Sequence, residues 1–331
     1  MTVDLDKLFV GFSKMKVAVI GDVMLDTYWW GNVERISPEA PVPVVSVSQK
    51  EKRIGGAGNV ALNVQALGAS VALLTILGDD EDGIQLKKLL HDKNIDTRYI
   101  LESKKRITTN KIRIISRNQH MMRLDAEIVN DLDFVDEENL QNQVEKFINT
   151  EKPDVVIFED YNKGILTKNI IENTITFCQK NNIITAVDPK RKNFFSYRNA
   201  TLFKPNLNEA IAGLNLLPEE VSPELLSNIH LQLKEQLDHS ISLITLSEKG
   251  VFYQENDHKK IVPSHRRNIA DVSGAGDTVI AVASLIYAAT KNIDLAAKIA
   301  NIAGGIVCEE VGTVPIQKEK LFQECQKLIS A

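Results

Sequence analysis

The chain has 331 residues, 44% of them hydrophobic, which is enough to bury a large core and predicts one big α/β domain with an appendage, or two domains. A formal net charge of -5 argues against a general nucleic-acid-binding protein, whose surface is usually basic. The cysteines Cys178, Cys308 and Cys325 are far apart and lack the spacing of a zinc site, so we expect free thiols in a reducing compartment. No apolar run is long enough to span a bilayer or to form a secretory leader, which favours a cytoplasmic protein without a membrane partner.

Short β-branched runs alternate with helical patterns along the chain, as is typical of a mostly parallel sheet covered by helices. In the first part we expect strands over 16–20 and 71–77, a helix over 82–93, and a proline-flanked edge strand over 44–47 outside the main sheet. The later predicted strands are 155–158, 183–187, 201–203 and 241–246, followed by a hairpin of 250–254 with 259–262. The later predicted helices are 137–149, 167–181, 208–213, 223–237, 275–290, 294–309 and 317–330.

Polar side chains follow several of these strands, and the carboxyl ends of parallel strands form the ligand crevice of an open α/β sheet. Asp22 and Asp26 follow the first strand; Asp22 suits a substrate contact or a local cap equally well. Three further polar sets, at 159–164, 188–191 and 204–209, predict one crevice, although each alone could be a helix cap. The last set includes Asn206 and Glu209, oxygen ligands of the kind Mg²⁺ accepts through water, and 245–250 suits nucleotide contact.

The run Asp271–Thr278 precedes a long apolar helix and combines small residues with an acid. Such a run lets the backbone approach an anion, which the helix start attracts through its free N–H groups and dipole. Asp277 would then place a carboxylate beside the anion, where it could take a proton. The alternative is an ordinary glycine-rich loop before a core helix.

Two other segments suggest ligand contact. Gly55, Gly56 and Asn59 form a second glycine-rich turn in which Asn59 could bind sugar hydroxyls, although a lone turn of this kind is weak evidence. Between 103 and 124 there are seven Lys and Arg side chains and no Asp or Glu, which favours an anion-facing lid over edge strands that merely resist aggregation. The lack of aromatic residues in that segment disfavours single-strand nucleic-acid binding.

Some features receive no functional role. Gly304 and Gly305 inside a predicted helix indicate either a close approach by another group or simple helix packing. The histidines show no ligand spacing, and we expect His239, His258 and His265 to face solvent.

The two glycine runs, at 55–61 and 271–277, resemble the paired motifs of the ribokinase/PfkB carbohydrate kinase family. The shorter runs 21–26, 35–44, 116–119, 160–164 and 188–190 are similar to the heptose-phosphate kinases of that family, over essentially the whole chain. The resemblance implies a ribokinase-like three-layer α/β/α fold with a mostly parallel Rossmann-like sheet and a small β-strand lid. It implies a single kinase domain, 1–331, with lid segments near 27–52 and 104–125. Bifunctional members carry a C-terminal adenylyltransferase domain with an HxGH-type motif, which we do not expect here because the motif is absent.

The same resemblance implies ATP and Mg²⁺ as cofactors and assigns roles to individual residues. Asp277 would be the catalytic base and Gly274, Ala275 and Gly276 the anion hole. The implied sugar-binding residues are Asp26, Gly55, Gly56 and Asn59, with the sugar phosphate read by Arg113, Arg117 and Lys163 or Lys190. The implied nucleotide-binding residues are Asn206, Glu209, Ser247, Lys249, Gly250, Gly276 and Asn301. Asn206 and Glu209 would hold Mg²⁺ through water, and Asp271 and Ser273 a monovalent cation such as K⁺.

The implied reaction is phosphorylation of the C1 hydroxyl of a heptose 7-phosphate. Two alternatives stay open: a kinase for another sugar or sugar phosphate, such as fructose 6-phosphate or ribose, and a catalytically silent nucleotide-binding regulatory protein. Exposed lid strands also predict a homodimer formed through the lid.

Overall fold

The computed structural model describes residues 4–117 and 119–329. Its larger sheet has nine strands in the order β13-β12-β11-β10-β9-β8-β1-β4-β5. These are β1 (Lys16–Gly21), β4 (Ser70–Gly78), β5 (Ile100–Ser103), β8 (Val155–Glu159), β9 (Ile184–Asp188), β10 (Leu202–Phe203), β11 (Ile241–Thr245), β12 (Val251–Glu255) and β13 (His258–Val262). Every neighbouring pair is parallel except the two that involve β12.

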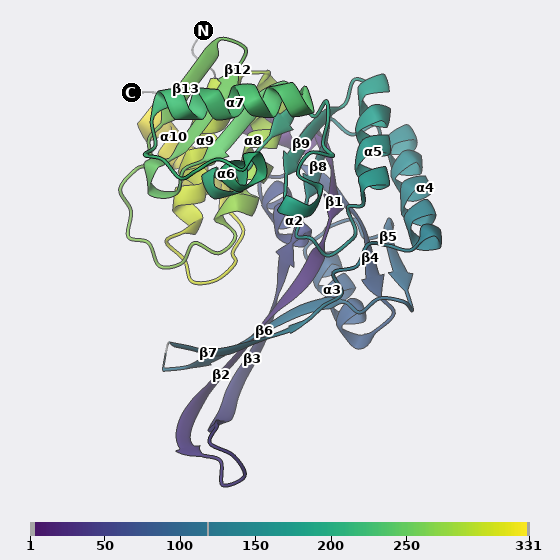
Figure 1. The fold of residues 1–331 in the computed structure, drawn as a ribbon, viewed down its shortest axis with the longest axis vertical. Helices are drawn as coiled ribbons and strands as arrows, with labels where there is room; N and C mark the ends of the chain where they lie inside the picture. Colours follow the sequence, from purple (N-terminus) through teal and green to yellow (C-terminus); the bar gives the residue numbers. More distant parts are fainter. Residues whose placement is uncertain (1–3, 118, 330–331) are drawn as a thin grey trace.

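Helices cover both faces of this sheet (Figure 1). In β1, Val17 and Val19 point into one apolar cluster, and Ala18 and Ile20 point into the other, because successive side chains of a strand alternate. The first cluster includes side chains of α1 (Leu5–Gly11), α2 (Ala57–Ala66), α3 (Glu81–Asp92), α8 (Ala275–Thr290), α9 (Ile293–Val307) and α10 (Lys318–Ile329). The second includes side chains of α4 (Phe134–Glu151), α5 (Lys168–Lys180), α6 (Leu207–Leu214) and α7 (Pro223–Leu237). The predicted three-layer α/β/α architecture is confirmed.

A second sheet of four strands projects from this body (Figure 1). Its strands, in the order β3-β2-β6-β7, are β2 (Val23–Ile36), β3 (Pro43–Gly56), β6 (Thr109–Ser116) and β7 (Gln119–Ala126). We call this sheet the lid. The side chain of Asn110 ties its base to α3, because it accepts from Thr27 Oγ1 (2.7 Å) and donates to Asp82 Oδ2 (2.7 Å).

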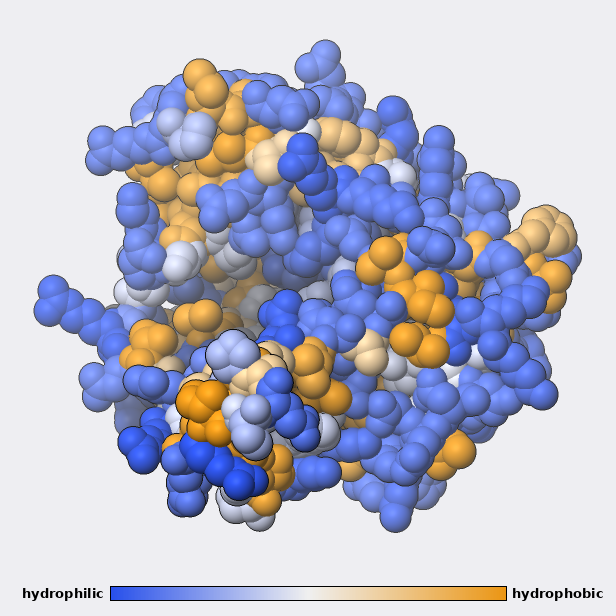
Figure 2. All heavy atoms as spheres, turned by 60° about the horizontal axis from the view of Figure 1, so that its bottom comes forward, coloured by the Kyte–Doolittle hydropathy of each residue, from blue (hydrophilic) through white to orange (hydrophobic). Residues whose placement is uncertain are grey.

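The lid strands overlap both predicted lid segments, although 104–108 precede β6 and lie outside the sheet. Strand β3 is an edge strand as expected, but it is longer than the predicted strand 44–47. Pro38 and Pro41 lie in the loop between β2 and β3, so the prolines of this region do not interrupt the strands. The end of the lid carries exposed apolar side chains between charged ones, as Figure 2 shows from the side toward which the lid projects. The predicted turn residue Asn118 lies outside the described residues.

Most predicted helices and strands end within three residues of the observed ones, and the helices 223–237 and 275–290 have the observed bounds. Outside the lid, one α-helix and one strand were not predicted. The first is α1, whose N-cap Asp4 accepts from the backbone N–H of Lys7 (3.0 Å), and the second is the short strand β5. Among the described residues, no helix combines the length and the apolar character that a membrane span requires.

The prediction for His239 was wrong, because its side chain is buried. His239 Nε2 and His230 Nδ1 lie 2.6 and 2.9 Å from Ser242 Oγ, and the His239 ring packs against Phe203. His258 and His265 are exposed as expected. The helical glycines are explained by packing of side chains, since a Cβ on Gly304 would lie 2.8 Å from Val279 and one on Gly305 would lie 2.6 Å from Arg267.

Candidate active site

The polar strand ends converge at one edge of the large sheet. Glu159 at the end of β8 is paired with Gly21 of β1 on one side and with Asp188 of β9 on the other. Lys204 follows β10 directly. The N-terminus of α8 lies at the same edge, and its first turn brings Asp277 close to Glu159 and Asp188. The predicted crevice is therefore present.

Asp277 is buried, with 4% of its surface exposed, and both of its oxygens accept hydrogen bonds. Asn59 Nδ2 donates to Oδ2 and the Tyr161 hydroxyl donates to Oδ1, each at 2.8 Å. Burial raises the pKa of Asp277 above its ordinary value, and the nearby Asp188 carboxylate acts in the same direction, while the two hydrogen bonds oppose the rise. An oriented carboxylate with a raised pKa is suited to accept a proton from a hydroxyl group.

The start of α8 forms the predicted cradle. Gly274 caps the helix in the left-handed region, at φ 78°, and a Cβ there would lie 2.8 Å from Asn59 Nδ2, so this position requires glycine. Within the first turn, the N–H of Ala275 donates to the carbonyl oxygen of Val272 (3.3 Å) and that of Thr278 to the carbonyl oxygen of Gly274 (3.0 Å). The N–H groups of Gly276 and Asp277 bind no backbone carbonyl among the described residues, as is usual at a helix start. Gly276 faces Lys204, since a Cβ on Gly276 would lie 3.7 Å from Lys204 Nζ. An anion at this point would meet backbone donors, the positive end of the helix dipole and an ammonium group.

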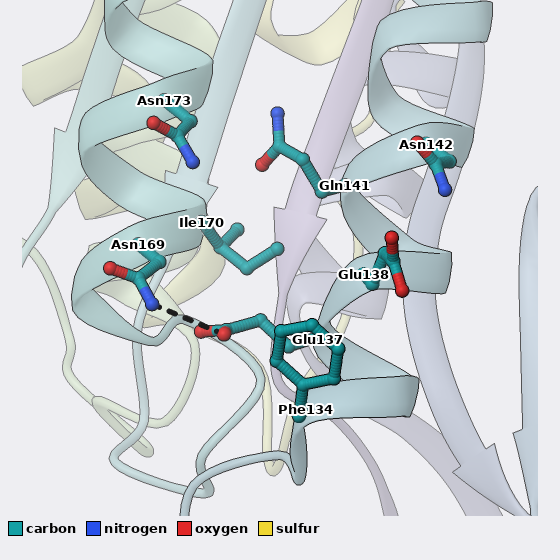
Figure 3. A pocket seen from close by; sticks show the side chains of 8 residues that line it. All are labelled: Phe134, Glu137, Glu138, Gln141, Asn142, Asn169, Ile170 and Asn173. Atoms are coloured by element: carbon teal, nitrogen blue, oxygen red, sulfur yellow. Dashed lines mark hydrogen bonds between the residues drawn. The ribbon is translucent and has the colours of Figure 1, made fainter.

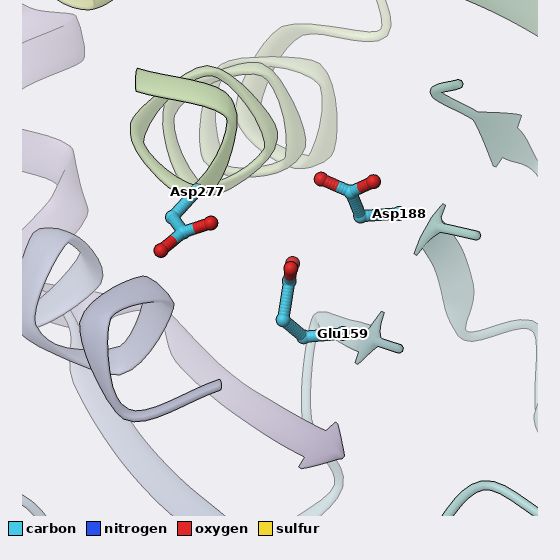
Figure 4. Close-up of side chains that lie close together, drawn as sticks. All are labelled: Glu159, Asp188 and Asp277. Atoms are coloured by element: carbon cyan, nitrogen blue, oxygen red, sulfur yellow. The ribbon is translucent and has the colours of Figure 1, made fainter. Parts of the chain in front are cut away.

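Beside Asp277 lie two further buried carboxylates, Glu159 and Asp188, and the three side chains point toward one another (Figure 4). One oxygen atom from each lies within 4.8 Å of the others. Lys204 Nζ is 2.7 Å from Asp188 Oδ2, and Lys190 Nζ is 3.5 Å from Asp188 Oδ1. Although burial opposes its charged form, the two lysines hold the pKa of Asp188 below its ordinary value. Burial and the neighbouring Asp188 and Asp277 carboxylates raise the pKa of Glu159 well above its ordinary value.

The residues assigned to Mg²⁺ cap a helix. Asn206 Oδ1 accepts from the N–H of Glu209, and Glu209 Oε2 accepts from the N–H of Asn206, each at 2.8 Å. This capping box at the start of α6 engages both side chains. Glu209 Oε1, the remaining oxygen, lies 2.5 Å from Lys190 Nζ. Because these oxygens are engaged, Asn206 and Glu209 are better suited to hold Mg²⁺ through water than to coordinate it directly. Binding through water is also what the family resemblance implies.

The predicted sugar-binding residues lie where the lid joins the body. A Cβ on Gly55 would lie 2.2 Å from Asp26 Oδ2, and Gly56, at φ 59°, would place one 2.3 Å from the carbonyl oxygen of Asp22. Arg113 of β6 forms an ion pair with Asp26. Asn59 connects this region to Asp277, as described above. Asp26, Gly55, Gly56, Asn59 and Arg113 thus lie close together at the junction of the lid and the body.

The structure separates the other basic residues assigned to the sugar phosphate. Lys190 lies in the crevice between Asp188 and Glu209. Lys163 Nζ binds Glu127 Oε1 at 2.8 Å, next to Lys111 of the lid. Arg117 is exposed just beyond the end of β6, four residues from Arg113, which corresponds to roughly 13 Å along a strand.

The predicted nucleotide residues surround the β11–β12 junction. Ser247 and Lys249 are the ends of a short 3₁₀ helix. Gly250 adopts φ 96°, and a Cβ added there would lie only 2.1 Å from the carbonyl oxygen of Val262. Asn301 Nδ2 donates to the carbonyl oxygen of Pro263 at 2.8 Å, so this side chain connects α9 to the end of β13. These contacts bring the four residues to one region of the sheet edge.

Asp271 and Ser273, assigned to a monovalent cation, form a turn before α8. Asp271 Oδ1 accepts from the N–H (3.0 Å) and the hydroxyl (2.8 Å) of Ser273, and Oδ2 accepts from the N–H of Gly312 (2.9 Å). Both oxygens thus have donors, and their remaining lone pairs could serve a weakly bound monovalent ion.

From the sequence, Asp22 could contact a substrate or cap a local turn, and the structure shows the local role. Its carboxylate accepts backbone N–H groups of Tyr161 (2.8 Å), Lys163 (3.0 Å) and Ile165 (3.2 Å), and so shapes the loop after β8. Glu159, Tyr161 and Lys204 belong to the polar sets predicted to line the crevice, but none of the three was given a role of its own from the sequence. Their position at or just after the end of a strand was the only signal.

A separate cavity of about 240 Å³ lies on the outer surface between α4 and α5 (Figure 3). It is lined by residues such as Phe134, Gln141 and Asn173, and Asn169 donates to Glu137 across its lower end. It contains none of the predicted site residues, so it does not compete with the crevice as the candidate active site.

The family model described as pfkB family carbohydrate kinase matches residues 14–320. The bifunctional protein HldE of Sulfurimonas denitrificans is 40% identical over 303 residues, which cover 91% of this chain and 62% of the relative. The chain therefore spans less than two thirds of the length of that relative.

Among solved structures, phosphofructokinase-2 from Escherichia coli in complex with potassium has a TM-score of 0.79 at 18% identity, covering 96% of this chain and 99% of that one. Arabidopsis thaliana ribokinase complexed with ribose and ATP has a TM-score of 0.73 at 16% identity, covering 93% and 99%. Both similarities show a ribokinase-like fold. Because the family model matches most of its length, the chain belongs to the pfkB family of carbohydrate kinases.

Proposed function

We propose that the chain transfers the γ-phosphoryl group of ATP to the C1 hydroxyl of D-glycero-β-D-manno-heptose 7-phosphate and forms the 1,7-bisphosphate. This reaction would serve ADP-heptose and lipopolysaccharide core synthesis, in the cytoplasm. The observation that carries the proposal is the buried Asp277 carboxylate, held by Asn59 and Tyr161 at the anion-attracting start of α8. The heptose motifs of the sequence, and the 40% identity to a protein named HldE, support the substrate.

In the proposed mechanism Asp277 takes the proton of the sugar hydroxyl while the hydroxyl oxygen bonds to the γ-phosphorus and the bond to the ADP oxygen breaks. The N–H groups at the start of α8 and the Lys204 ammonium stabilise the negative charge on the transferred group. Bound Mg²⁺ would supply further neutralisation of the ATP phosphates, with Asn206 and Glu209 holding it through water. Asp26 and Asn59 would orient the sugar, and Arg113 with Lys163 or Lys190 would bind its 7-phosphate. Positioning of this kind accounts for most of the catalysis that phosphoryl transfer requires.

The nucleotide would lie against Ser247, Lys249, Gly250 and Asn301, which gather at the β11–β12 junction. The turn of Asp271 and Ser273 would bind a monovalent cation such as K⁺. This proposal is supported by its position directly before the anion-binding helix start, where a bound cation would strengthen the local positive potential.

We also propose that residues 1–331 work as one kinase unit that dimerises through the lid. Strand β7 is exposed along its whole length, and Met122 and Leu124 on it are 54% and 43% exposed. Apolar side chains on an uncovered sheet favour pairing with a second copy. Light scattering should show a dimer for the wild-type protein and a monomer for the double variant Met122→Lys, Leu124→Lys. A wild-type protein that is monomeric at all concentrations would refute this proposal.

A coupled assay for ADP over a panel of sugars and sugar phosphates tests the substrate. We expect the highest kcat/KM with the heptose 7-phosphate. A clear preference for fructose 6-phosphate or ribose would show that the chain is a sugar kinase with a different substrate. Absence of ADP formation with every sugar, together with measurable ATP binding, would instead support the regulatory alternative.

A further inference from the structure

One side chain of the lid binds a loop of the body close to the start of α8. Arg53 of β3 donates from Nη1 to the carbonyl oxygen of Val311 (2.9 Å), which lies in the loop between α9 and α10. The approach is tight, because Gly312 adopts φ 75° and a Cβ on it would lie 2.3 Å from Arg53 Nη1. A larger residue at position 312 would therefore push Arg53 away from the loop.

Contacts within the lid hold the Arg53 guanidinium in place. Its Nε donates to Glu51 Oε1 at 2.6 Å, and its Cζ lies 4.9 Å from the ring centroid of Tyr28. Arg113 Cζ lies 5.3 Å from the centroid of the same ring, and Trp30 stacks against Tyr28 with the ring centroids 5.5 Å apart. Arg53 is thus joined to the part of the lid where Arg113 would bind the sugar phosphate.

The loop that accepts this hydrogen bond also contacts the start of α8. The N–H of Gly312 donates to Asp271 Oδ2 (2.9 Å), in the turn directly before the helix. A Cβ on Gly274, the N-cap of α8, would lie 3.1 Å from the methyl group of Thr313. Among the described residues, no backbone–backbone hydrogen bond involves 311–315. Contacts with side chains therefore decide where this loop lies.

We propose that Arg53 is a positioning residue for phosphoryl transfer, which holds the loop 311–313 and, through it, the start of α8. Each step of this path is one contact: from Arg53 to the loop, from the loop to Asp271, and from the loop to Gly274. The proposal rests on the proposed function, since it takes the start of α8 as the place where the γ-phosphoryl group of ATP binds. It requires no contact between Arg53 and either substrate.

Binding of two nucleotides in the absence of sugar tests this role. AMP-PNP carries a γ-phosphoryl group and ADP lacks one, so under the proposed mechanism only AMP-PNP places an anion at the start of α8. By calorimetry in excess MgCl₂, we expect the Kd for AMP-PNP to be roughly three- to tenfold higher in Arg53→Met than in the wild type, the range that an anion contact at a helix start contributes. The Kd for ADP should stay close to the wild-type value. Equal changes for both nucleotides, or no change for either, would overturn the proposal.

Tryptophan fluorescence gives a second readout, because Trp29 and Trp30 are the two tryptophans of the chain and both lie on β2 of the lid. Binding of AMP-PNP without sugar should change the emission of the wild type, since coupling between two sites acts in both directions. The change should be lost in Arg53→Met and largely kept in Arg53→Lys, whose ammonium group can still donate to the Val311 carbonyl. An unchanged wild-type emission at saturating AMP-PNP, or the same change in Arg53→Met, would contradict the link.

The matched control is Arg98→Met, which should behave like the wild type in both measurements. Arg98 also pairs with an acid two residues earlier, Asp96 (2.6 Å), and its Cζ lies 5.5 Å from the ring centroid of the neighbouring Tyr99. This control removes the same kind of ion pair and ring contact at a site remote from the lid.

The variant Gly312→Ala breaks the same contact from the side of the loop, and it serves as the test if Arg53→Met does not fold. It should show the same loss of AMP-PNP affinity and of the emission change, and wild-type values for both would refute the role of Arg53. The kinase proposal has its own outcome. A wild type that forms ADP from ATP and sugar keeps that proposal even if the Arg53 variant binds both nucleotides normally, whereas a wild type that binds no nucleotide refutes the kinase reaction itself.

Discussion

The crevice and the lid differ in how deeply their side chains are buried and in how firmly hydrogen bonds hold them. In the crevice, the Asp277 carboxylate is buried and each of its oxygens has a donor. In the lid, strand β7 is exposed throughout, and Asn110 at the base of the sheet donates to Asp82 of α3. Rigid, dry surroundings suit proton transfer, whereas an exposed sheet can adapt to a substrate. The comparison predicts that crevice substitutions lower kcat and lid substitutions raise the KM for the sugar phosphate.

The largest effect is expected for Asp277→Asn. Loss of the proton acceptor should lower kcat by about 10²–10⁴, because this is the range that a positioned general base contributes. Binding of an ATP analogue and the melting temperature should stay close to wild type, since the amide is nearly isosteric. Near-normal turnover would remove Asp277 from the role of base.

The lid side of the comparison is tested by Arg113→Ala. Loss of a charged hydrogen-bond donor to a phosphate costs about 1.5–3 kcal/mol, so the KM for sugar phosphate should rise roughly 10–100-fold, with little change in the KM for ATP. Arg117→Ala should act on the same parameter by a smaller factor, because Arg117 lies beyond the end of β6. Equal increases in the two KM values would show that these arginines do not read the sugar phosphate.

Tyr161→Phe tests the hydrogen-bond support of Asp277. The Tyr161 hydroxyl opposes the rise in the pKa of Asp277, so its removal should raise that pKa further. Because the base acts in its deprotonated form, kcat/KM falls as pH drops through this pKa, and the acid limb of the pH profile should move to higher pH. An unchanged acid limb would show that Tyr161 does not tune the base.

The smallest effect is expected for the buried histidines His230 and His239, which belong to neither the crevice nor the lid. Burial lowers the pKa of His230 to about 4 and that of His239 to about 3, in each case below the ordinary value of 6.5. The unfolded chain then binds protons that the folded chain does not, so stability should fall as pH drops below about 6.5. We expect the melting temperature to decrease by a few degrees between pH 7 and 5, and less in His239→Gln than in the exposed-site control His258→Gln. The same decrease in both variants would exclude the buried pair as its source.

The sequence predicted the layers, most elements and the position of Asp277, because strand periodicity and a glycine-rich helix start are local signals. It did not reveal the bond from Tyr161 to Asp277 or that from Asn59 to Asp277, since these residues are 116 and 218 positions apart. It placed Glu159 at a strand end without showing that its oxygens lack partners. A helix cap was one of the two interpretations left open for the set 204–209, and the structure shows its specific form, a capping box formed by Asn206 and Glu209.

The most direct test is ³¹P NMR of the product formed from ATP and D-glycero-β-D-manno-heptose 7-phosphate. The proposed function predicts a new phosphoester on C1 with wild-type protein, formed together with ADP, and none on the same time scale with Asp277→Asn. A phosphoester at another position, or equal product formation by the Asp277→Asn variant, would contradict it.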